Sequence, residues 1–430
     1  MGNTLPSIPD RWQKPFFTIW VGQAISLIGS SLVQFAIIWW LTEKTHSATV
    51  LARASLMALV PNVLFAPVAG VVVDLYSRRI LMIVSDSVVA IATLSLAILF
   101  LIGNVEIIHI YIVLLIRAIG GNLQFPAMRA STSLMVPESH LSKVAGYNQI
   151  LNNSLRIVTP PLGAILLNAL PLQSILMIDV LTAIAGITPL FFVFIPQANQ
   201  TIEQHSSFSF WKDLKSGAQY IRSMPGFVYI IAIMSILNFL LDPAFSLTPI
   251  LVQNHFGGGA IQFAWVQSAP SIGGLASGFI FSIWVVKRKV LTSMLGVAGV
   301  GLGCLMMGLA PSKALWLAIS GSFLITIMMG ISDAPMGALL QARIAPDMQG
   351  RVFSTMGSLM SIFSPLGLLI SGPLSDHIGV QIWFILGGVM CLFMGLVATR
   401  IAPILQFENR PVNNVTASIQ SPVYPSPNQE

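Results

Sequence analysis

Twelve long apolar stretches constrain the fold of this sequence more than any other feature. A helix needs about 20 mostly apolar residues to cross a bilayer. The chain is 55% hydrophobic and only 8% charged, whereas soluble domains carry about 25% charged residues. We therefore expect an all-α membrane protein with 12 transmembrane helices. The expected spans are 16–40, 49–73, 80–102, 108–130, 144–168, 172–195, 226–252, 261–286, 290–310, 313–337, 352–373 and 380–402.

The lysines and arginines predict how these spans are oriented. With a cytoplasmic N-terminus and alternating spans, sixteen of the 21 basic residues lie inside and three fall within spans. Lys44 and Lys313 are left outside. Cytoplasmic loops are enriched in Lys and Arg, so we expect a multi-pass protein of the cell membrane with both termini cytoplasmic. The bias also accounts for the net charge of +6 without a nucleic-acid partner.

The connections between spans divide the chain into five parts. Most connections are short, two near 131–143 and 338–351 are longer, and the longest one separates the first six spans from the last six. The C-terminal tail is rich in Pro, Asn and Ser, a composition typical of disorder. We expect a cytoplasmic N-terminus (1–15), an N-terminal six-helix half (16–195), a cytoplasmic central linker (196–225), a C-terminal six-helix half (226–402) and a disordered cytoplasmic tail (403–430).

An internal repeat supports this division into halves. The segment FPAMRASTSLMVPE at 125–138 aligns with APMGALLQARIAPD at 334–347. Duplicated halves are common in transport proteins, and the alignment predicts two pseudo-symmetric halves. At a constant offset of 209 residues, Pro126 matches Pro335, Pro137 matches Pro346, Glu138 matches Asp347 and Gly163 matches Gly372.

A cluster of charges interrupts the apolar sequence APVAGVVVDLYSRRILM at 66–82. Asp74, Arg78 and Arg79 lie within a stretch of six residues, and this stretch begins four residues after Gly70. Such a cluster between two spans is either a solvated turn without a specific role or a functional element of the membrane protein. Its spacing decides which family the sequence resembles.

The sequence resembles the major facilitator superfamily. The turn between spans 2 and 3 has Gly70, Asp74, Arg78 and Arg79 at the spacing of the family signature. It departs from that signature at Leu75, where Arg is usual, and at Ser77, where Gly is usual. Span 4 adds a second family feature, an Arg followed by glycines. These residues are Arg117, Gly120 and Gly121 in LLIRAIGG.

Four further stretches are similar to the macrolide-efflux branch of that superfamily, which is itself similar to siderophore exporters. The resemblance implies two six-helix halves that rock about a central site and export amphipathic or hydrophobic small molecules. It implies inward proton flow as the energy source. We expect no bound cofactor and a monomer. The stretches are WVGQAISLIGSS at 20–31, VPESHLSKVAGYNQ at 136–149, MIDVLTA at 177–183 and MQGRVFS at 348–354.

The resemblance leaves other functions open. Siderophore or metabolite export, phospholipid translocation and uptake all use the same architecture, as does a non-transporting membrane sensor. By resemblance, Gly70 would permit close helix approach, and Asp74 would lock an inner gate while the protein faces outward.

Polar stripes mark two of the expected helices. Gln23 and Gln34 lie on a polar face of span 1, and Asn148, Asn152 and Arg156 recur every four residues in span 5. Residues at this spacing share one helix face. They form either a wall of a substrate path or a buried network that joins neighbouring helices.

Span 4 carries Arg117 and, two turns later on the same face, Gln124. Arg stays protonated in proteins. By resemblance, Arg117 would couple proton movement to transport by keeping a nearby carboxylate charged until a proton or substrate displaces it.

Four acidic residues fall within spans, where a charge is costly and marks a candidate site. Asp242 precedes Pro243 in span 7 and is the first choice for a protonatable coupling group, and Asp333 in span 10 is the second. We expect structural roles for the other two. Asp86 would partner the Arg78–Arg79 cluster, and Asp179 would either cap a helix or pair within the bundle.

No enzyme signature accompanies these features. The sequence has no GxxxxGK[ST] phosphate loop, so drive by ATP within this chain is not expected. The six histidines and two cysteines show no metal-ligand spacing. We therefore expect neither enzymatic activity nor a bound metal.

Overall fold

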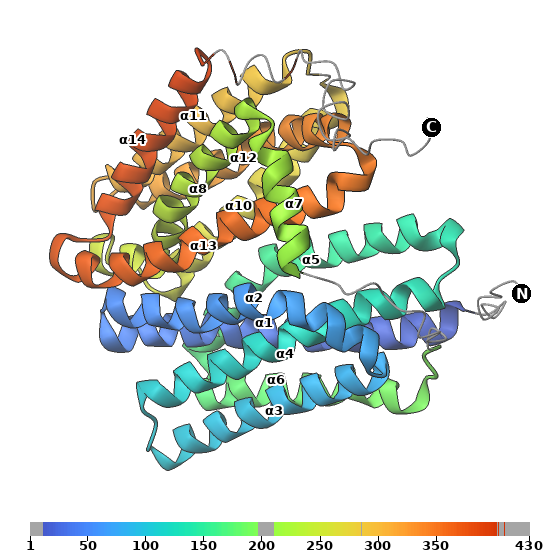
Figure 1. Ribbon diagram of the computed structural model, residues 1–430. Coiled ribbons are helices and arrows are strands. Elements are labelled where there is room, and N and C mark those ends of the chain that lie inside the picture. Colours follow the sequence, from blue (N-terminus) through green and yellow to red (C-terminus); the bar gives the residue numbers. More distant parts are fainter. Residues whose placement is uncertain (1–11, 197–209, 285, 402, 404–407, 409–430) are drawn as a thin grey trace, which may run out of the picture.

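The computed structural model describes residues 12–196, 210–284, 286–401, 403 and 408. Over these residues the chain is helical, with twelve long helices arranged in two groups (Figure 1). The long helices are α1 (Gln13–Thr45), α2 (Ala48–Leu75), α3 (Arg78–Ile102), α4 (Ile107–Met135), α5 (Glu138–Ala169), α6 (Leu172–Phe192), α8 (Pro225–Ser246), α10 (Ala260–Ile283), α11 (Lys289–Gly308), α12 (Leu315–Arg343), α13 (Pro346–Ile378) and α14 (Gln381–Ala398). The shorter elements are α7 (Phe210–Arg222), α9 (Thr248–Ile250) and the π-helical turn η1 (Leu251–His255).

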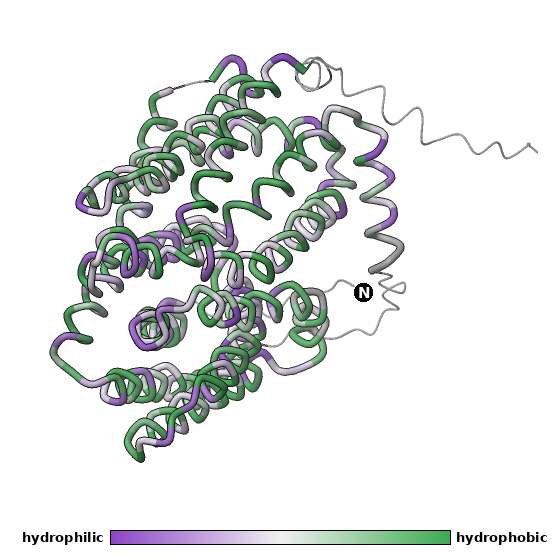
Figure 2. Tube along the Cα trace, turned by 90° about the vertical axis from the view of Figure 1, so that its left-hand side faces the viewer, coloured by the Kyte–Doolittle hydropathy of each residue, from purple (hydrophilic) through white to green (hydrophobic). Residues whose placement is uncertain are grey.

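The long helices have the length and surface of membrane-spanning helices. Eleven of the described helices are long and apolar enough to cross a bilayer. The twelfth, α10, has 24 residues but is diluted by polar side chains such as Gln262, Gln267 and Ser268. Large apolar side chains such as Ile91 and Leu181 are exposed, and Figure 2 shows apolar residues along most of the helices. Such a surface suits lipid, so this is a multi-pass membrane protein.

Each expected span coincides with a long helix, although several helices extend beyond their apolar stretches. The prediction of longer loops near 131–143 and 338–351 was wrong. There α4 continues to Met135 before α5 begins at Glu138, and α12 continues to Arg343 before α13 begins at Pro346. Polar residues outside the bilayer still form helical hydrogen bonds, so hydropathy marks where the apolar stretch ends and not where the helix ends.

The internal repeat extends through the whole helical region. When α1 to α6 are shifted by 209 residues, their first residues fall within three residues of the starts of α8, α10, α11, α12, α13 and α14. Pro137 and Pro346 occupy matching places at the beginning of α5 and α13. In Figure 1, α1 to α6 lie together below and α8 to α14 lie above. The two groups, called here the N half and the C half, meet mainly where α2 packs on α13 and α5 packs on α10.

The linker between the halves contains a helix that hydropathy does not reveal. Residues 197–209 lie outside the described residues, and α7 follows them. The hydroxyl of Tyr220 on α7 accepts a hydrogen bond from the backbone N–H of Ala345 at 3.2 Å. Gly217 packs closely on α13, where an added Cβ would lie 2.8 Å from the Arg351 carbonyl oxygen. The linker helix is therefore attached to the C half.

The tail expected to be disordered, 403–430, lies almost entirely outside the described residues. Its Glu408 is described, and its carboxylate caps the first turn of α11. The carboxylate accepts from the backbone N–H groups of Lys289 at 2.8 Å and Val290 at 3.2 Å. A carboxylate is favourable at a helix N-terminus because it satisfies free N–H groups and the helix dipole. This part of the tail is attached to the C half as well.

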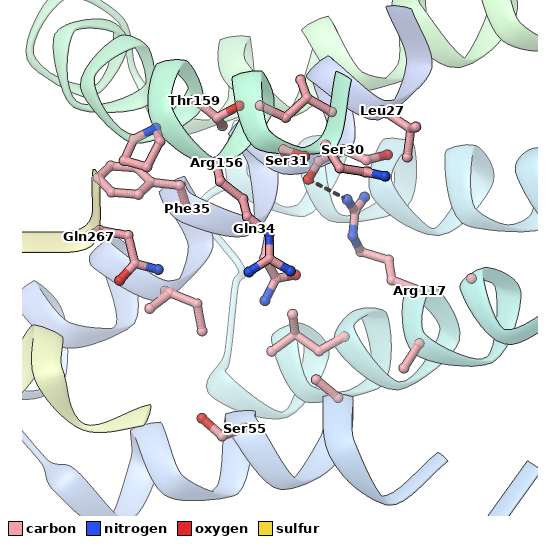
Figure 3. A pocket seen from close by; sticks show the side chains of 18 of the residues that line it. Leu27, Ser30, Ser31, Gln34, Phe35, Ser55, Arg117, Arg156, Thr159 and Gln267 are labelled. Atoms are coloured by element: carbon pink, nitrogen blue, oxygen red, sulfur yellow. Dashed lines mark hydrogen bonds between the residues drawn. The ribbon is translucent and has the colours of Figure 1, made fainter. Parts of the chain in front are cut away.

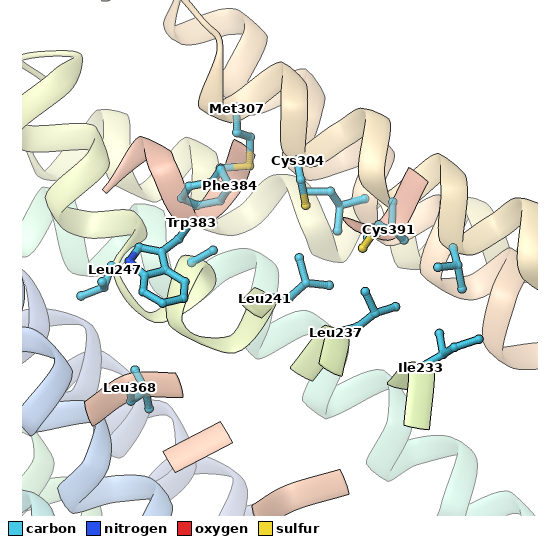
Figure 4. Close-up of a cluster of buried hydrophobic side chains, with 14 of the residues drawn as sticks. Ile233, Leu237, Leu241, Leu247, Cys304, Met307, Leu368, Trp383, Phe384 and Cys391 are labelled. Carbon is cyan, nitrogen blue, oxygen red and sulfur yellow. The ribbon is translucent and has the colours of Figure 1, made fainter. Parts of the chain in front are cut away.

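The core of the C half is apolar and closely packed. Figure 4 shows Leu241 of α8, Cys304 and Met307 of α11, and Phe384 and Cys391 of α14 gathered in one cluster. The last four of these are at most 2% exposed. The cluster holds α8, α11 and α14 together and is continuous with buried N-half residues such as Trp39 and Leu51.

Candidate functional site

A cavity of about 830 Å³ lies between the two halves. Its walls come from α1, α2, α3, α4 and α5 of the N half and from α8, α9 and α10 of the C half. Figure 3 shows several of its side chains. The volume lies within the range of small-molecule binding pockets. Its polar lining consists of Ser30, Ser31, Gln34, Ser55, Asn62, Asp86, Arg117, Gln124, Asn152, Arg156, Thr159, Ser246, Gln267 and Ser271.

Hydrogen bonds between the halves close the end of the bundle at the α1–α2 turn, called here the far end. The carboxylate of Asp376, on α13, accepts from the backbone N–H groups of Ala48 at 2.6 Å and Thr49 at 3.2 Å, in the first turn of α2. It also accepts from the Ser47 hydroxyl at 3.0 Å. One carboxylate of the C half thus caps a helix of the N half.

Aromatic stacking reinforces this closure deeper in the bundle. The ring of Phe263 on α10 stacks on Phe35 of α1 at 5.2 Å between centroids and on Trp39 of α1 at 5.5 Å. Phe35 and Phe263 also line the cavity. The stack therefore forms the end of the cavity that faces the far end.

A second cavity extends from the first toward the opposite end of the bundle, called here the terminus end, where α1 begins and α14 ends. It measures about 360 Å³ and shares Asn62, Arg117 and Gly121 with the first cavity. It adds Ala69 on α2 and Pro126 on α4, both closer to the terminus end of their helices. The two cavities form a path that leads toward the terminus end and ends at the stacked rings.

A buried ion pair fixes Arg117 in the wall of the cavity. One guanidinium nitrogen bonds to a carboxylate oxygen of Asp179 and donates to the Thr93 hydroxyl at 2.8 Å, and the other donates to the Ser30 carbonyl at 2.9 Å. Asp179 accepts from the Ser30 hydroxyl at 2.9 Å as well. The side chains of Arg117 and Asp179 are only 8% and 2% exposed. This network joins α1, α3, α4 and α6, and the partner carboxylate of Arg117 is Asp179.

The structure places Asp86 in the cavity wall instead of beside the Arg78–Arg79 cluster. Its carboxylate accepts from the Gln23 amide at 2.9 Å, and the Gln23 carbonyl accepts from Gln124. Among the described residues Asp86 forms no ion pair. The expected partnership with the arginines is therefore replaced by a neutral amide contact, because α3 packs on α4 and α6 and the Gln23 side chain of α1 reaches Asp86 there.

The polar residues of span 5 fit both predictions, since some join neighbouring helices and others line the cavity. The side-chain oxygen of Asn148 accepts from the indole N–H of Trp20 at 2.7 Å, which joins α5 to α1. Asn152 and Arg156 line the cavity, and Figure 3 shows Arg156 close to Gln34. One end of the stripe joins helices, and the other faces the open space.

Asp242 and Asp333 do not line the cavity. Asp242 is half-buried on α8, and Asp333 is exposed on α12; the residues that line the cavity include none from α12. The helix that contains Asp242 does break just beyond Pro243, where α8 gives way to α9 at Leu247. Phe245 and Ser246 at this break line the cavity. A coupling role for the two acids stays a prediction.

The charged turn near residue 75 is only partly described. Arg79 donates to the Phe191 carbonyl at 2.7 Å, and one buried nitrogen of Arg78 has no hydrogen bond among the described residues. The side chain of Asp74 lies outside the described residues. The close helix approach expected at Gly70 was wrong for this structure, since an added Cβ there would meet no atom within 4 Å. The gating role of the turn stays a prediction.

Sequence reasoning missed several residues of the site. Thr93 was not distinguished from other small polar residues, yet its hydroxyl binds both members of the Arg117–Asp179 pair. Gln267 and Ser271 of α10 also line the cavity. Their signal was available, because Gln267 is one of the few amides in an otherwise apolar span and lies one helical turn from Ser271.

Comparisons with known proteins agree with this architecture. The profile of the Major Facilitator Superfamily matches two overlapping segments, residues 19–362 and 243–425. The chain is 32% identical to macrolide efflux protein A of Streptococcus pyogenes over 400 residues, covering 93% of this chain and 98% of that protein. It is 29% identical to macrolide efflux protein A of Enterococcus faecalis over 323 residues, covering 75% and 99%.

A solved structure supports the fold independently of sequence. A bacterial homologue of the iron transporter ferroportin in an inward-facing state superimposes with a TM-score of 0.68. The match covers 92% of this chain and 99% of that one at 13% identity. Twelve long helices in two repeated halves, the family profile over most of the chain and a relative of nearly equal length agree. The chain belongs to the major facilitator superfamily.

Proposed function

We propose that this protein is a drug-efflux transporter that exports amphipathic or hydrophobic small molecules by alternating access, and that it is not an enzyme. The observation that carries the proposal is the cavity between the halves, which is closed at the far end and continued toward the terminus end. The relatives named macrolide efflux protein A support a macrolide-type drug as cargo.

The proposed orientation places both termini in the cytoplasm. The terminus end then faces the cytoplasm, so that the cavity in this structure receives its substrate from inside. The bias of basic residues toward that side supports this orientation. Outward opening would require that the bonds between Asp376 and the first turn of α2 break.

We propose inward proton flow as the energy source. A proton can drive export only if it binds with different affinity to the inward-open and outward-open states. Buried carboxylates beside the cavity support this proposal, because protonation changes the charge within the path. The transporter would act as a monomer in the lipid bilayer, without a bound cofactor.

Transport into proteoliposomes tests the proposal. The purified protein would be reconstituted with a pH gradient, acidic inside vesicles in which the cytoplasmic face of the transporter is outside. Erythromycin should accumulate in these vesicles, and the accumulation should stop when an ionophore removes the gradient. Empty vesicles provide the control. Equal uptake with and without protein would reject drug efflux, and uptake that survives the ionophore would reject proton coupling.

The same function predicts a phenotype in cells. A bacterial host that lacks its own pumps should tolerate several-fold more erythromycin when it expresses this protein. A panel of siderophores and lipophilic drugs would then define the range of substrates. Unchanged tolerance to macrolides and other lipophilic drugs would remove this substrate class.

A further inference from the structure

The N half contains two buried acidic residues with opposite surroundings. Asp179 on α6 is bound by Arg117, Thr93 and Ser30, so both its charge and its hydrogen bonds are satisfied. Asp86 on α3 is 9% exposed, and from the part of the chain that the structure describes it accepts one side-chain hydrogen bond, from Gln23. Both carboxylate oxygens of Asp179 accept hydrogen bonds, whereas among the described residues only one oxygen of Asp86 does.

Asp86 faces the substrate path. Asp86 lines the 830 Å³ cavity, whereas Asp179 does not. The Gln23 amide that bonds to one oxygen of Asp86 also donates to the Gly186 carbonyl at 3.2 Å, and its own carbonyl accepts from Gln124. All polar groups of Gln23 are thus used, and Gln23 is held with its N–H toward Asp86.

Within the described residues, no cation forms an ion pair with Asp86. On α4 and α6, which pack on α3, Arg117 and Asp179 neutralise each other, and Arg129 lies over the ring of Phe125. The charged residues of α1 are Lys14, Glu43 and Lys44, at the two ends of that helix. Asp86 accepts from the neutral amide of Gln23 on α1, and the Gln124 amide of α4 donates to Gln23 and not to Asp86. Arg156, on α5, lines the cavity but forms no ion pair in the part of the chain that the structure describes. An isolated carboxylate in such surroundings is unfavourable unless a proton or a cation neutralises it.

We propose that Asp86 is the carboxylate at which a proton and a cationic group of the substrate exclude each other. The inference rests on the proposed export function and names its substrate class as lipophilic amines. A substrate that arrives as an ammonium ion would displace the proton from the Asp86 carboxyl to water on the cytoplasmic side. The proton is released, no covalent bond to the substrate forms, and the net charge of the site is unchanged.

The remaining polar wall orients the same substrate. Arg156, Asn152 and Gln34 provide hydrogen-bond donors on α5 and α1. An amine held at Asp86 therefore leaves the carbonyl and hydroxyl oxygens of the substrate for these donors. The apolar remainder of the molecule would contact Phe245 and Phe263 of the C half.

Proton release on binding tests this exchange without requiring transport. Erythromycin would be added to the purified protein in weakly buffered detergent solution near neutral pH, where its amino group already carries a proton. A pH-sensitive dye would then report the protons released. We expect the wild-type protein to release about one proton for each drug molecule bound, and Asp86→Asn to release at least tenfold less. Asp86→Glu should restore release because it keeps the carboxylate.

Two other variants make the outcome specific. Glu106→Gln removes a carboxylate in the turn before α4, outside the cavity, and should leave proton release unchanged. Asp242→Asn tests the rival acid on α8. The inference is overturned if Asp86→Asn still releases a proton for each bound drug, or if Asp242→Asn alone abolishes release. Failure of wild-type vesicles to accumulate erythromycin would instead reject the export function, whatever the dye reports.

Discussion

The two halves share one helical framework but contribute different chemistry to the cavity. All charged residues of its wall, Asp86, Arg117 and Arg156, come from the N half. The C half contributes rings, prolines and neutral polar groups. Its lining residues are Phe245, Ser246, Pro249, Phe263, Gln267, Pro270 and Ser271.

The two halves carry different residues at positions that the repeat makes equivalent. At the offset of 209 residues, Arg117 corresponds to Thr326 and Asp179 corresponds to Gly388. Where the N half joins α4 and α6 by an ion pair, the C half brings α11 and α14 into close contact. A Cβ added at Gly388 would lie 2.9 Å from the Gly301 carbonyl oxygen of α11. The N half has a buried ion pair where the C half has a close backbone contact, and only the N half places ionisable groups in the cavity wall.

Removing Arg117 should have the largest effect. Arg117→Met leaves the Asp179 carboxylate buried without a cation, which costs about 3–5 kcal/mol when one partner of a buried pair is lost. Thr326→Val, at the matching position of the C half, should change stability by less than about 1 kcal/mol. Thermal unfolding of the purified protein in detergent measures both.

The double variant Arg117→Met with Asp179→Leu separates charge from shape. Removing both charges should recover most of the lost stability, because a buried pair and an apolar pair of similar volume are often nearly equal. If the single and double variants unfold at the same temperature, the charge is not what holds the N half together.

A methyl group at Gly388 should have the next largest effect and should act on the C half. Gly388→Ala places its Cβ 2.8 Å from Leu305 Cγ, and overpacking of this kind costs about 1–3 kcal/mol. Gly278→Ala on α10 is the matched control, since its Cβ would meet no atom within 4 Å. Because Ala is the better helix former, the control should be neutral or slightly more stable. Equal unfolding temperatures for the two variants would contradict close packing as the basis of the C half.

Asp376 joins the halves at the far end, and its loss should change their relative position. Asp376→Ala removes three hydrogen bonds to α2. Losing a helix cap costs about 1 kcal/mol, so the far end should open about five-fold more often. Spin labels on cysteines introduced at Lys44 and Leu309, both exposed at that end, report the distance by pulsed electron resonance.

Glu43→Ala, which removes an exposed carboxylate at the same end of α1, provides the control and should not lengthen the distance. The native Cys304 and Cys391 are buried and should not take up label. An unchanged distance distribution in Asp376→Ala would show that the stacked rings alone keep the far end closed.

The helical framework could be predicted from the sequence because bilayer thickness acts on each span separately. Every expected span became a helix, and the matching prolines Pro137 and Pro346 located the repeat. The linker helix α7 was missed because it is amphipathic and short. Its buried residues Tyr220 and Ile221 face α13 and not lipid, a contact that hydropathy does not report.

For the site residues, the sequence could predict the helix face on which each one lies but not its partner. Periodicity placed Arg117 and Arg156 on polar faces, and both line the cavity. It could not tell which helix each polar residue meets. Asn148 meets Trp20 of another helix, and Asp86 meets Gln23. Asp86 and Asp179 looked alike in sequence, because the difference between them is the direction of Arg117 in three dimensions.

The smallest effect expected concerns the rings that the C half adds to the cavity. Phe263→Leu removes the stack with Phe35 and Trp39, and an aromatic pair contributes about 0.5–1.5 kcal/mol beyond its buried area. Phe279→Leu on the same helix is the control, since that ring is 69% exposed, and it should change stability by less than about 0.5 kcal/mol. Because Phe263 carries no charge, its loss should leave the proton released on erythromycin binding unchanged while weakening the binding itself. A loss of proton release at saturating drug would show instead that the C half takes part in the charge chemistry, and the division between the halves would fail.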